Sequence, residues 1–309
     1  MKKKIFRISL VLFLVLTLTG CTKSLKDENK KPVKNEVTGQ NLPSNILCRA
    51  EDEETIKLYE KNNVKMSELP KCSEFKITSG GYDGIWSTIF VRPLAWVIVK
   101  IGLLVKNYGL AIIIITLLIR LLLYPVTKKT ALQSENMKLA QNDLKKLEKK
   151  YQGKQDQETM MQKSQEMMII YKKYNINPLS GCLFAFIQLP LFLAFYEAMN
   201  RLPAIFEENL LFFQLGTSPI TALQSGKPYY LIFVVLVFLA TYFSFKLNST
   251  ASMSQDQEKQ MKMMSRISVI MITIASITMS VGIQIYWIFN SLFTIIQNIL
   301  VKRKKAHVK

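Results

Sequence analysis

The most constraining feature of this sequence is the alternation of long apolar stretches with short blocks of Lys and Arg. The chain has 309 residues, of which 49% are hydrophobic, and a formal net charge of +19. An apolar run of about 20 residues is long enough to cross the hydrocarbon core of a bilayer as a helix. Basic residues beside such runs mark cytoplasmic ends of spans and require no nucleic acid partner. The composition therefore predicts an all-α integral membrane protein in a bacterial cell membrane.

Residues 1–20 have the pattern of a lipoprotein signal peptide. Basic residues precede an apolar core that ends at Leu18 and is too short to span a membrane. Small residues then lead directly to Cys21. In this pattern the Cys21 thiol carries a diacylglycerol and, after cleavage, its amino group carries an N-acyl lipid. We expect these chains to hold the mature N-terminus outside, and we expect no other cofactor. An ordinary signal peptide with a coincidental cysteine is the alternative.

Hydropathy and loop charge together predict a five-helix transmembrane bundle with an outer amphipathic helix and a cytoplasmic helical hairpin. The expected order is an extracellular tether over 21–82, an outer interfacial amphipathic helix over 83–106, the first span over 107–127, the cytoplasmic hairpin over 128–176, the second span over 177–200, an extracellular loop over 201–227, the third span over 228–246, a cytoplasmic loop over 247–265, the fourth and fifth spans over 266–281 and 282–301, and a basic cytoplasmic tail over 302–309. In the tether we expect one short helix near 51–61.

Loop charge supports this order at both ends of the bundle. The segment 128–174 contains 11 Lys against 6 Asp and Glu, and the tail contains four consecutive basic residues, so both belong in the cytoplasm. The stretch 83–106 is interrupted by Arg92 and Lys100, and one additional crossing there would invert everything that follows. The hairpin methionines are either its core or an adaptable surface for other proteins.

The cysteines and the single histidine give little evidence of a catalytic or metal site. Cys48 and Cys72 lie in the exported segment, where they either form a disulfide or remain two free thiols. Cys182 lies in an apolar helix and reads as a packing residue. The only histidine is His307 in the tail, so we expect no metal site and no enzyme active site.

Arg120 is the residue that most needs an explanation, because it lies inside the first span. It precedes Lys128 by eight residues, which places it about 12 Å from the cytoplasmic end. The only acidic residue within a span is Glu197, about 28 Å from that side, so the sequence offers Arg120 no fixed carboxylate partner. Its guanidinium either snorkels to the inner headgroups or faces a water-filled cavity that opens to the cytoplasm.

Helical spacing favours the cavity, since polar residues share one face on several spans. Thr116, Arg120 and Tyr124 are spaced by four. The third span adds Thr241, Ser244 and Asn248, and Gln188 lies beside Pro190 in the middle of the second. The fifth span carries a longer stripe, formed by Trp287, Asn290, Ser291, Thr294 and Asn298. We predict a groove formed by Arg120, Thr116, Tyr124, Gln188, Thr241, Ser244, Trp287 and Asn290.

Three motifs in this order resemble the YidC family of membrane insertases in its Gram-positive lipoprotein form. They are the run Ile119-Arg120-Leu-Leu-Leu-Tyr124-Pro125, the segment Ile187-Gln188-Leu189-Pro190, and the closing Gly282-Ile-Gln-Ile-Tyr286-Trp287 with Asn290 and Gln297. The resemblance covers about residues 85–304. It implies that Arg120 is the groove arginine, that Gln188 and Trp287 lie near it, and that the hairpin recruits clients or ribosomes.

The resemblance implies an insertase and chaperone for nascent membrane proteins, acting alone or with the secretion channel. The sequence contains no nucleotide-binding loop, and partitioning of an apolar client helix into lipid can itself supply the driving force. The alternative is a polytopic anion transporter or channel that uses Arg120 to bind its solute. Transporters of this size generally show internal repeats with broken helices, which this sequence lacks.

Overall fold

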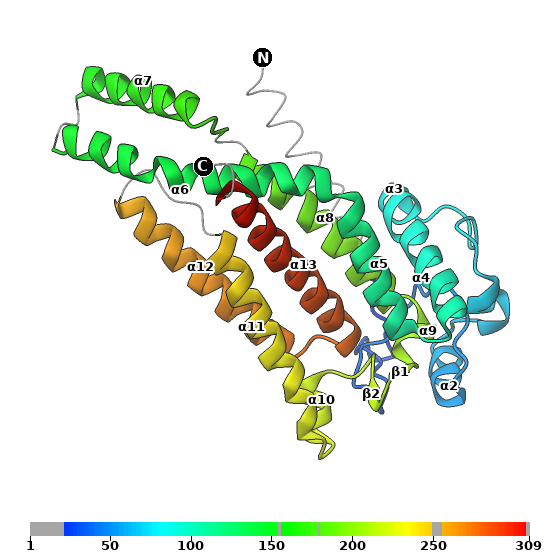
Figure 1. Cartoon of the computed structure of the whole chain (residues 1–309). Coiled ribbons are helices and arrows are strands. Elements are labelled where there is room, and N and C mark those ends of the chain that lie inside the picture. Colours follow the sequence, from blue (N-terminus) through cyan, green and yellow to red (C-terminus); the bar gives the residue numbers. More distant parts are fainter. Residues whose placement is uncertain (1–21, 154–155, 178–179, 249–254, 307–309) are drawn as a thin grey trace. The chain divides into compact units, whose positions relative to one another are not determined.

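The computed structural model describes residues 22–153, 156–177, 180–248 and 255–306, which are mostly helical (Figure 1). They divide into two compact units. The first unit consists of the described residues in Met1–Leu118, Gln188–Val235 and Ala275–Phe289, and the second of those in Ile119–Ile187, Leu236–Ile274 and Asn290–Lys309. The expected signal peptide, Cys21 and His307 lie outside the described residues.

The first unit begins with a small N-terminal domain, residues 22–76, and continues into helices. The domain contains α2 (Glu53–Lys61) and two 3-10 turns, Met66–Glu68 and Cys72–Glu74. The other elements are α3 (Gly84–Trp86), a π-helical turn (Ser87–Val91), α4 (Arg92–Val105), most of α5 (Tyr108–Leu122), the end of α8 (Ser180–Asn200), α9 (Pro203–Phe206), strands β1 (Asn209–Leu210) and β2 (Phe213–Gln214), α10 (Pro219–Gln224), a 3-10 turn (Pro228–Tyr230), and the beginnings of α11 (Leu231–Asn248) and α13 (Val281–Ala306).

The N-terminal domain has a hydrophobic core of its own, so the expectation of a loose tether over 21–82 is wrong for most of that segment. Isolated bridges pair Ser24 with Pro43 and Lys34 with Asn41. These pairings bring together buried apolar side chains that are far apart in sequence, and Phe206 of α9 completes the cluster. Its members are Leu25, Val33, Leu42, Ile46, Ala50, Tyr59, Met66 and Phe206. The segment is polar on average and most of its apolar residues are isolated in the sequence, so its composition did not predict a hydrophobic core.

Helix α2 confirms the short helix expected near 51–61. Asp52 caps its N-terminus by accepting a hydrogen bond from the Thr55 backbone N–H, and Glu53 and Glu54 in the first turn favour the helix dipole. Lys61 in the last turn has the complementary charge for the C-terminal end. These local signals explain why a short helix forms in an otherwise polar segment.

The stretch 83–106 is a continuous helical segment built from α3, the π-helical turn and α4. Leu94, Ala95, Ile98 and Val99 are buried on one face of α4, at the spacing of an amphipathic helix. Leu104 on the opposite face is 80% exposed. By length and composition this segment, Gly84–Val105, could also cross a membrane.

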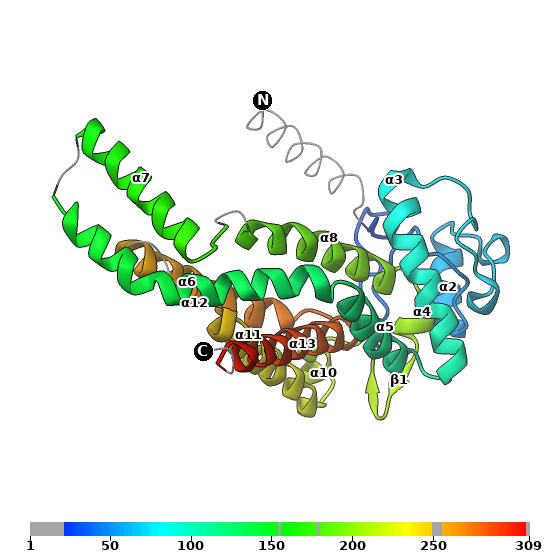
Figure 2. The same cartoon turned by 45° about the horizontal axis from the view of Figure 1, so that its top comes forward.

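The second unit contains an antiparallel hairpin formed by α6 (Tyr124–Lys150) and α7 (Gln157–Lys173), which lie side by side in Figures 1 and 2. The two helices pack through the buried residues Ala140, Leu144, Tyr171 and Ile176, with Met137 and Met167 beside them. Met160, Met161 and Met168 are instead more than half exposed. The core interpretation is therefore confirmed for Met137 and Met167, and an adaptable surface formed by the exposed methionines stays a prediction.

Helix α5 ends at Leu122, and the chain bends by 68° into α6. Pro125 lies at the first turn of α6, where its missing N–H leaves no helical hydrogen bond unmade. Within a continuous helix its ring would clash with the carbonyl of residue 121. The proline therefore separates the apolar α5 from the polar α6.

The remaining parts of the second unit come from α8, α11, α12 (Gln255–Ser276) and α13. Helix α12 begins eleven residues earlier than the expected fourth span, within the segment expected to be a loop. Three helical segments of the described chain are long and apolar enough to cross a membrane, namely Gly84–Val105, Pro228–Leu247 and Val281–Arg303. The bent pair α5–α6 gives a fourth if it counts as one span.

Candidate functional site

Arg120 is buried in the second unit and contacts the last helix. Its side chain is 2% exposed, and its Nε donates a hydrogen bond to Oδ1 of Asn290 on α13 over 2.5 Å. Asn290 is 6% exposed. The expectation that Arg120 has no fixed partner in the bundle is therefore wrong, since an amide from a different span provides one. An amide oxygen accepts a hydrogen bond from the guanidinium without cancelling its charge.

The polar stripe expected on the fifth span faces the interior of the molecule. Of its members on α13, Asn290, Ser291 and Thr294 are buried, while Trp287 and Asn298 are half-buried. Gln297, which is not part of the expected stripe, is also buried. Gln297 accepts a hydrogen bond from the Thr127 hydroxyl on α6, 3.1 Å away, one turn of α6 beyond the bend. Buried polar groups are stable only when hydrogen-bonded, so these contacts along α13 fix it beside the α5–α6 corner.

The bend in the chain changes the geometry expected for Tyr124. Spacing by four would place Thr116, Arg120 and Tyr124 on one helical face. Thr116 and Arg120 do lie on α5, where both are buried, but Tyr124 begins α6 after the bend. Its ring lies 5.9 Å from the Lys128 ammonium. The single-face interpretation is therefore wrong for Tyr124, because Pro125 starts a new helix.

In the first unit, two of the expected groove residues contact aromatic side chains. Gln188 Nε2 donates to the Tyr286 hydroxyl over 3.4 Å. Trp287 packs edge-on against Phe192, with ring centroids 5.2 Å apart. These contacts join α8 to the beginning of α13 within the first unit. The second and third motifs noted in the sequence therefore meet in the fold.

The expected groove residues divide between the two units. The first unit holds Thr116, Gln188 and Trp287, and the second holds Arg120, Tyr124, Thr241, Ser244 and Asn290. On α11, Thr241 is buried and Ser244 is half-buried. The structure brings Arg120 together with Asn290.

A second buried arginine, Arg201, forms a polar network in the first unit that the sequence interpretation missed. Its guanidinium donates to Glu197 Oε1 over 2.9 Å and to Asp83 Oδ2 over 2.5 Å. It also donates to the Asn45 carbonyl of the N-terminal domain over 2.6 Å. The Trp86 indole N–H donates to the other oxygen of Glu197 over 3.0 Å. The i,i+4 spacing of Glu197 and Arg201 was the available signal.

The N-terminal domain contains a disulfide, and a perturbed carboxyl group lies just after α9 in the same unit. Cys48 and Cys72 are bonded, with their Cα atoms 4.8 Å apart. Burial raises the pKa of the Glu207 carboxyl, just after α9, to about 7. Within the described part of the chain, no group of three His, Cys, Asp or Glu side chains could hold a metal ion.

Comparison with known proteins identifies the family of this chain. The family model of the 60Kd inner membrane protein matches residues 100–308. The membrane protein insertase YidC of Oceanobacillus iheyensis is 36% identical over 242 residues, 76% of this chain and 91% of that protein. The membrane protein insertase MisCA of Bacillus subtilis is 37% identical over 237 residues, 76% of this chain and 86% of that protein. The chain therefore belongs to the 60Kd inner membrane protein family, that of the YidC-type membrane protein insertases.

Proposed function

We propose that this chain is a membrane protein insertase and chaperone that moves apolar segments of newly made proteins into the bilayer. The observation that carries the proposal is the buried contact between Arg120 and Asn290 in helices of the membrane part. A charged side chain inside a membrane protein is costly, and such residues generally mark a functional path. The insertases among its relatives support the same activity.

The mechanism we propose uses a hydrated groove that opens toward the cytoplasm. Arg120 attracts the acidic outer end of a client and shortens the distance that this end must cross through hydrocarbon. The apolar client helix then partitions into lipid through the open side of the groove. With about 0.5 kcal/mol gained per strongly apolar residue, 20 residues provide about 10 kcal/mol. This driving force makes a fuel-binding site unnecessary.

The remaining parts of the molecule have supporting roles in this proposal. Lipid on Cys21 anchors the N-terminus outside, five spans cross the membrane, and the stretch 83–106 lies on the outer surface. The basic hairpin of α6 and α7 remains in the cytoplasm. Its exposed Met160, Met161 and Met168 offer an adaptable apolar surface among lysines for clients or ribosomes. The protein performs no covalent chemistry and acts alone or beside the secretion channel.

The decisive experiment is client insertion into liposomes that contain the purified full-length protein. A single-span client with an acidic tail is added, and protease protection of the tail measures insertion. We expect Arg120→Ala to abolish protection and Arg120→Lys to retain most of it, because lysine keeps the charge. A client with a neutral tail should be much less sensitive to Arg120→Ala.

Controls separate loss of function from loss of folding and from a different activity. Thermal unfolding in detergent identifies variants that fail to fold. Equal insertion by all three proteins would mean that Arg120 has no part in insertion. If the liposomes showed anion flux and no protection of the client, a transporter would replace the insertase as the function of this chain.

A further inference from the structure

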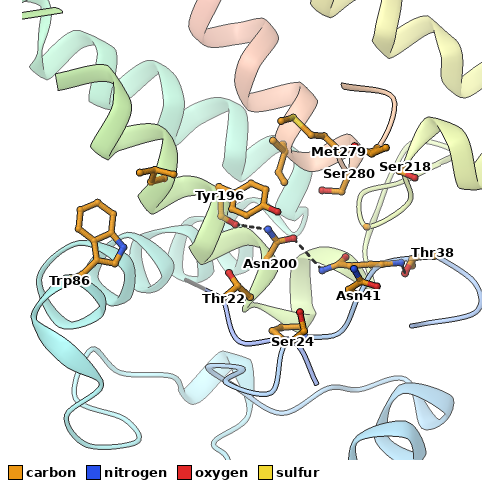
Figure 3. Close-up of a pocket in the computed structure, with 17 residues that line it drawn as sticks. Thr22, Ser24, Thr38, Asn41, Trp86, Tyr196, Asn200, Ser218, Met279 and Ser280 are labelled. Carbon is orange, nitrogen blue, oxygen red and sulfur yellow. Dashed lines mark hydrogen bonds between the residues drawn. The ribbon is translucent and has the colours of Figure 1, made fainter. Parts of the chain in front are cut away.

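The first unit contains a partly open cavity of about 500 Å³ at the base of the N-terminal domain (Figure 3). One wall comes from the beginning of that domain, including Thr22 and Gln40. The other comes from the end of α8 and the beginning of α13, including Leu193, Tyr196 and Ile283. The volume lies within the range of cavities that hold small organic ligands.

Two buried polar atoms of the cavity wall lack partners. Within the described residues, the Thr22 hydroxyl and Gln40 Oε1 have no hydrogen-bond partner. The Gln40 amide is held in place, because its Nε2 donates to Asn200 Oδ1 over 3.3 Å. Asn200 in turn donates to the Tyr196 carbonyl over 2.9 Å. A buried polar atom without a partner costs free energy, so this wall fits a ligand that both accepts and donates hydrogen bonds.

The opposite wall has a different chemistry. Leu193 and Ile283 offer aliphatic carbon, and Tyr196 and Trp86 add aromatic surface. The cavity is therefore amphiphilic: the wall from the N-terminal domain is mostly polar, and the opposite wall adds this apolar surface beside polar side chains such as Asn200 and Ser280. Glyceryl esters have this combination, because their carbonyl oxygens accept hydrogen bonds while their acyl chains are apolar.

Position in the chain identifies the source of such a ligand. Thr22 lines the cavity, and one peptide bond joins it to residue 21. Residue 21 is the cysteine that the lipoprotein pattern marks for lipidation. A diacylglyceryl group on its sulfur would begin within a few bonds of the cavity. The amino group of that residue, whether free or acylated, carries an N–H, the kind of donor that Gln40 Oε1 lacks among the described residues.

We propose that this cavity binds the glyceryl diester of the lipid on Cys21 of the same chain. The Thr22 hydroxyl donates to an ester carbonyl, Gln40 Oε1 accepts from the N–H of residue 21, and the acyl chains leave past Leu193 and Ile283. The lipid thus joins the N-terminal domain to α8 and α13 instead of being only a tether to the bilayer. This inference rests on the proposed lipidation of Cys21 and is independent of the insertase activity.

The test maps where the anchor lipid lies in native membranes. Cells that express the full chain receive an alkyne-tagged fatty acid with a diazirine either next to the carboxyl group or at the chain end. After irradiation, mass spectrometry distinguishes cross-links from the Cys21-linked lipid from adducts of free phospholipid. We expect the carboxyl-proximal probe on Cys21 to cross-link peptides that contain Leu193 and Ile283, severalfold more than the chain-end probe does.

Two matched variants and a lipid-free variant complete the design. Leu193→Trp fills the cavity and should lower these cross-links severalfold. Leu189→Trp, one turn earlier on α8 where the native leucine is 50% exposed, should leave them unchanged. Cys21→Ser should remove them without producing phospholipid adducts at the same peptides.

Other results would overturn the proposal. Phospholipid adducts in the cavity of wild type would assign it to free lipid. Cross-links spread equally over the exposed face of α11, with no effect of Leu193→Trp, would place the anchor in the bilayer alone. An unmodified Cys21 peptide would remove the premise, while client insertion, measured separately, would still decide the proposed function.

Discussion

The two buried arginines of this protein differ in the chemistry of their partners. Arg201 in the first unit donates to the carboxylates of Glu197 and Asp83, whereas Arg120 in the second donates to the amide of Asn290. Both are 2% exposed, so burial alone does not distinguish them. Carboxylates neutralise a guanidinium and fix it in place, while an amide holds its geometry and leaves its charge available. The comparison supports a structural role for Arg201 and agrees with the role in insertion that we propose for Arg120.

The largest effect should follow from removing Arg201. Arg201→Leu leaves the buried carboxylate of Glu197 without its cation, which typically costs about 3–5 kcal/mol. Denaturant unfolding followed by tryptophan fluorescence, with the disulfide kept intact, measures the loss. Arg120→Leu should destabilise the protein less while abolishing insertion. The same loss of stability from both substitutions would contradict the different roles of the two arginines.

The disulfide should contribute nearly as much to the first unit. It joins residues separated by 24 positions, and the loop-closure model gives about 3–4 kcal/mol for such a loop. Cys48→Ser should therefore expose the N-terminal domain to protease at lower denaturant concentration than wild type. Insertion by molecules that remain folded should be retained, because Arg120 lies in the other unit. Lost insertion in folded molecules would show that the N-terminal domain acts in function.

A negative charge placed beside Arg120 tests the functional role proposed for this arginine. Asn290→Asp keeps a hydrogen-bond acceptor of the same size but cancels the guanidinium charge. We expect insertion of an acidic-tailed client to fall about tenfold, which corresponds to about 1.4 kcal/mol, with little loss of thermal stability. Protease protection measures insertion, and Asn290→Gln serves as the uncharged control. Full activity in Asn290→Asp would contradict attraction by charge.

The smallest effect concerns pH and the carboxyl group of Glu207. Its pKa is about 7 in the folded chain and 4.5 as a free side chain. The folded state therefore binds more protons between these values, and stability should be highest below pH 4.5 and decrease as pH rises to about 7. Glu207→Gln should flatten this dependence in unfolding curves measured across that window. An unchanged slope in the variant would assign the dependence to a different group.

Local patterns in the sequence predict part of this structure well. The cap and charges of α2, the amphipathic hairpin of α6 and α7, and the polar stripe of α13 all depend on residues within a few turns of one another. Their physical causes, namely capping, dipole charge and helical periodicity, are visible in a single stretch of sequence. Each of these elements is present in the structure.

Contacts between distant residues account for what the sequence did not predict. Asn290 is 170 positions from Arg120, and Asn45 is 156 from Arg201. No local pattern identifies such partners, so the sequence indicated an unpartnered Arg120 and missed the Arg201 network. The sequence also did not predict the hydrophobic core of the N-terminal domain. Phe206 completes that core and lies beyond α8 in the chain. Helix α12 begins early because polar residues of good helix propensity extend it beyond its apolar part.

The corner at Pro125 also has a mechanical consequence. Helix α6 continues for 27 residues from Tyr124, which makes it a rigid arm of about 40 Å. Arg120 lies only a few residues from the pivot, and Thr127 is bonded to Gln297 on the near side of the arm. A large particle that pushed on the far end of α6 would therefore produce a large torque at the corner beside Pro125. Small rotations at the corner would change the position of the Arg120 guanidinium. A force on the far end of α6 and the position of Arg120 would therefore be coupled through one stiff helix.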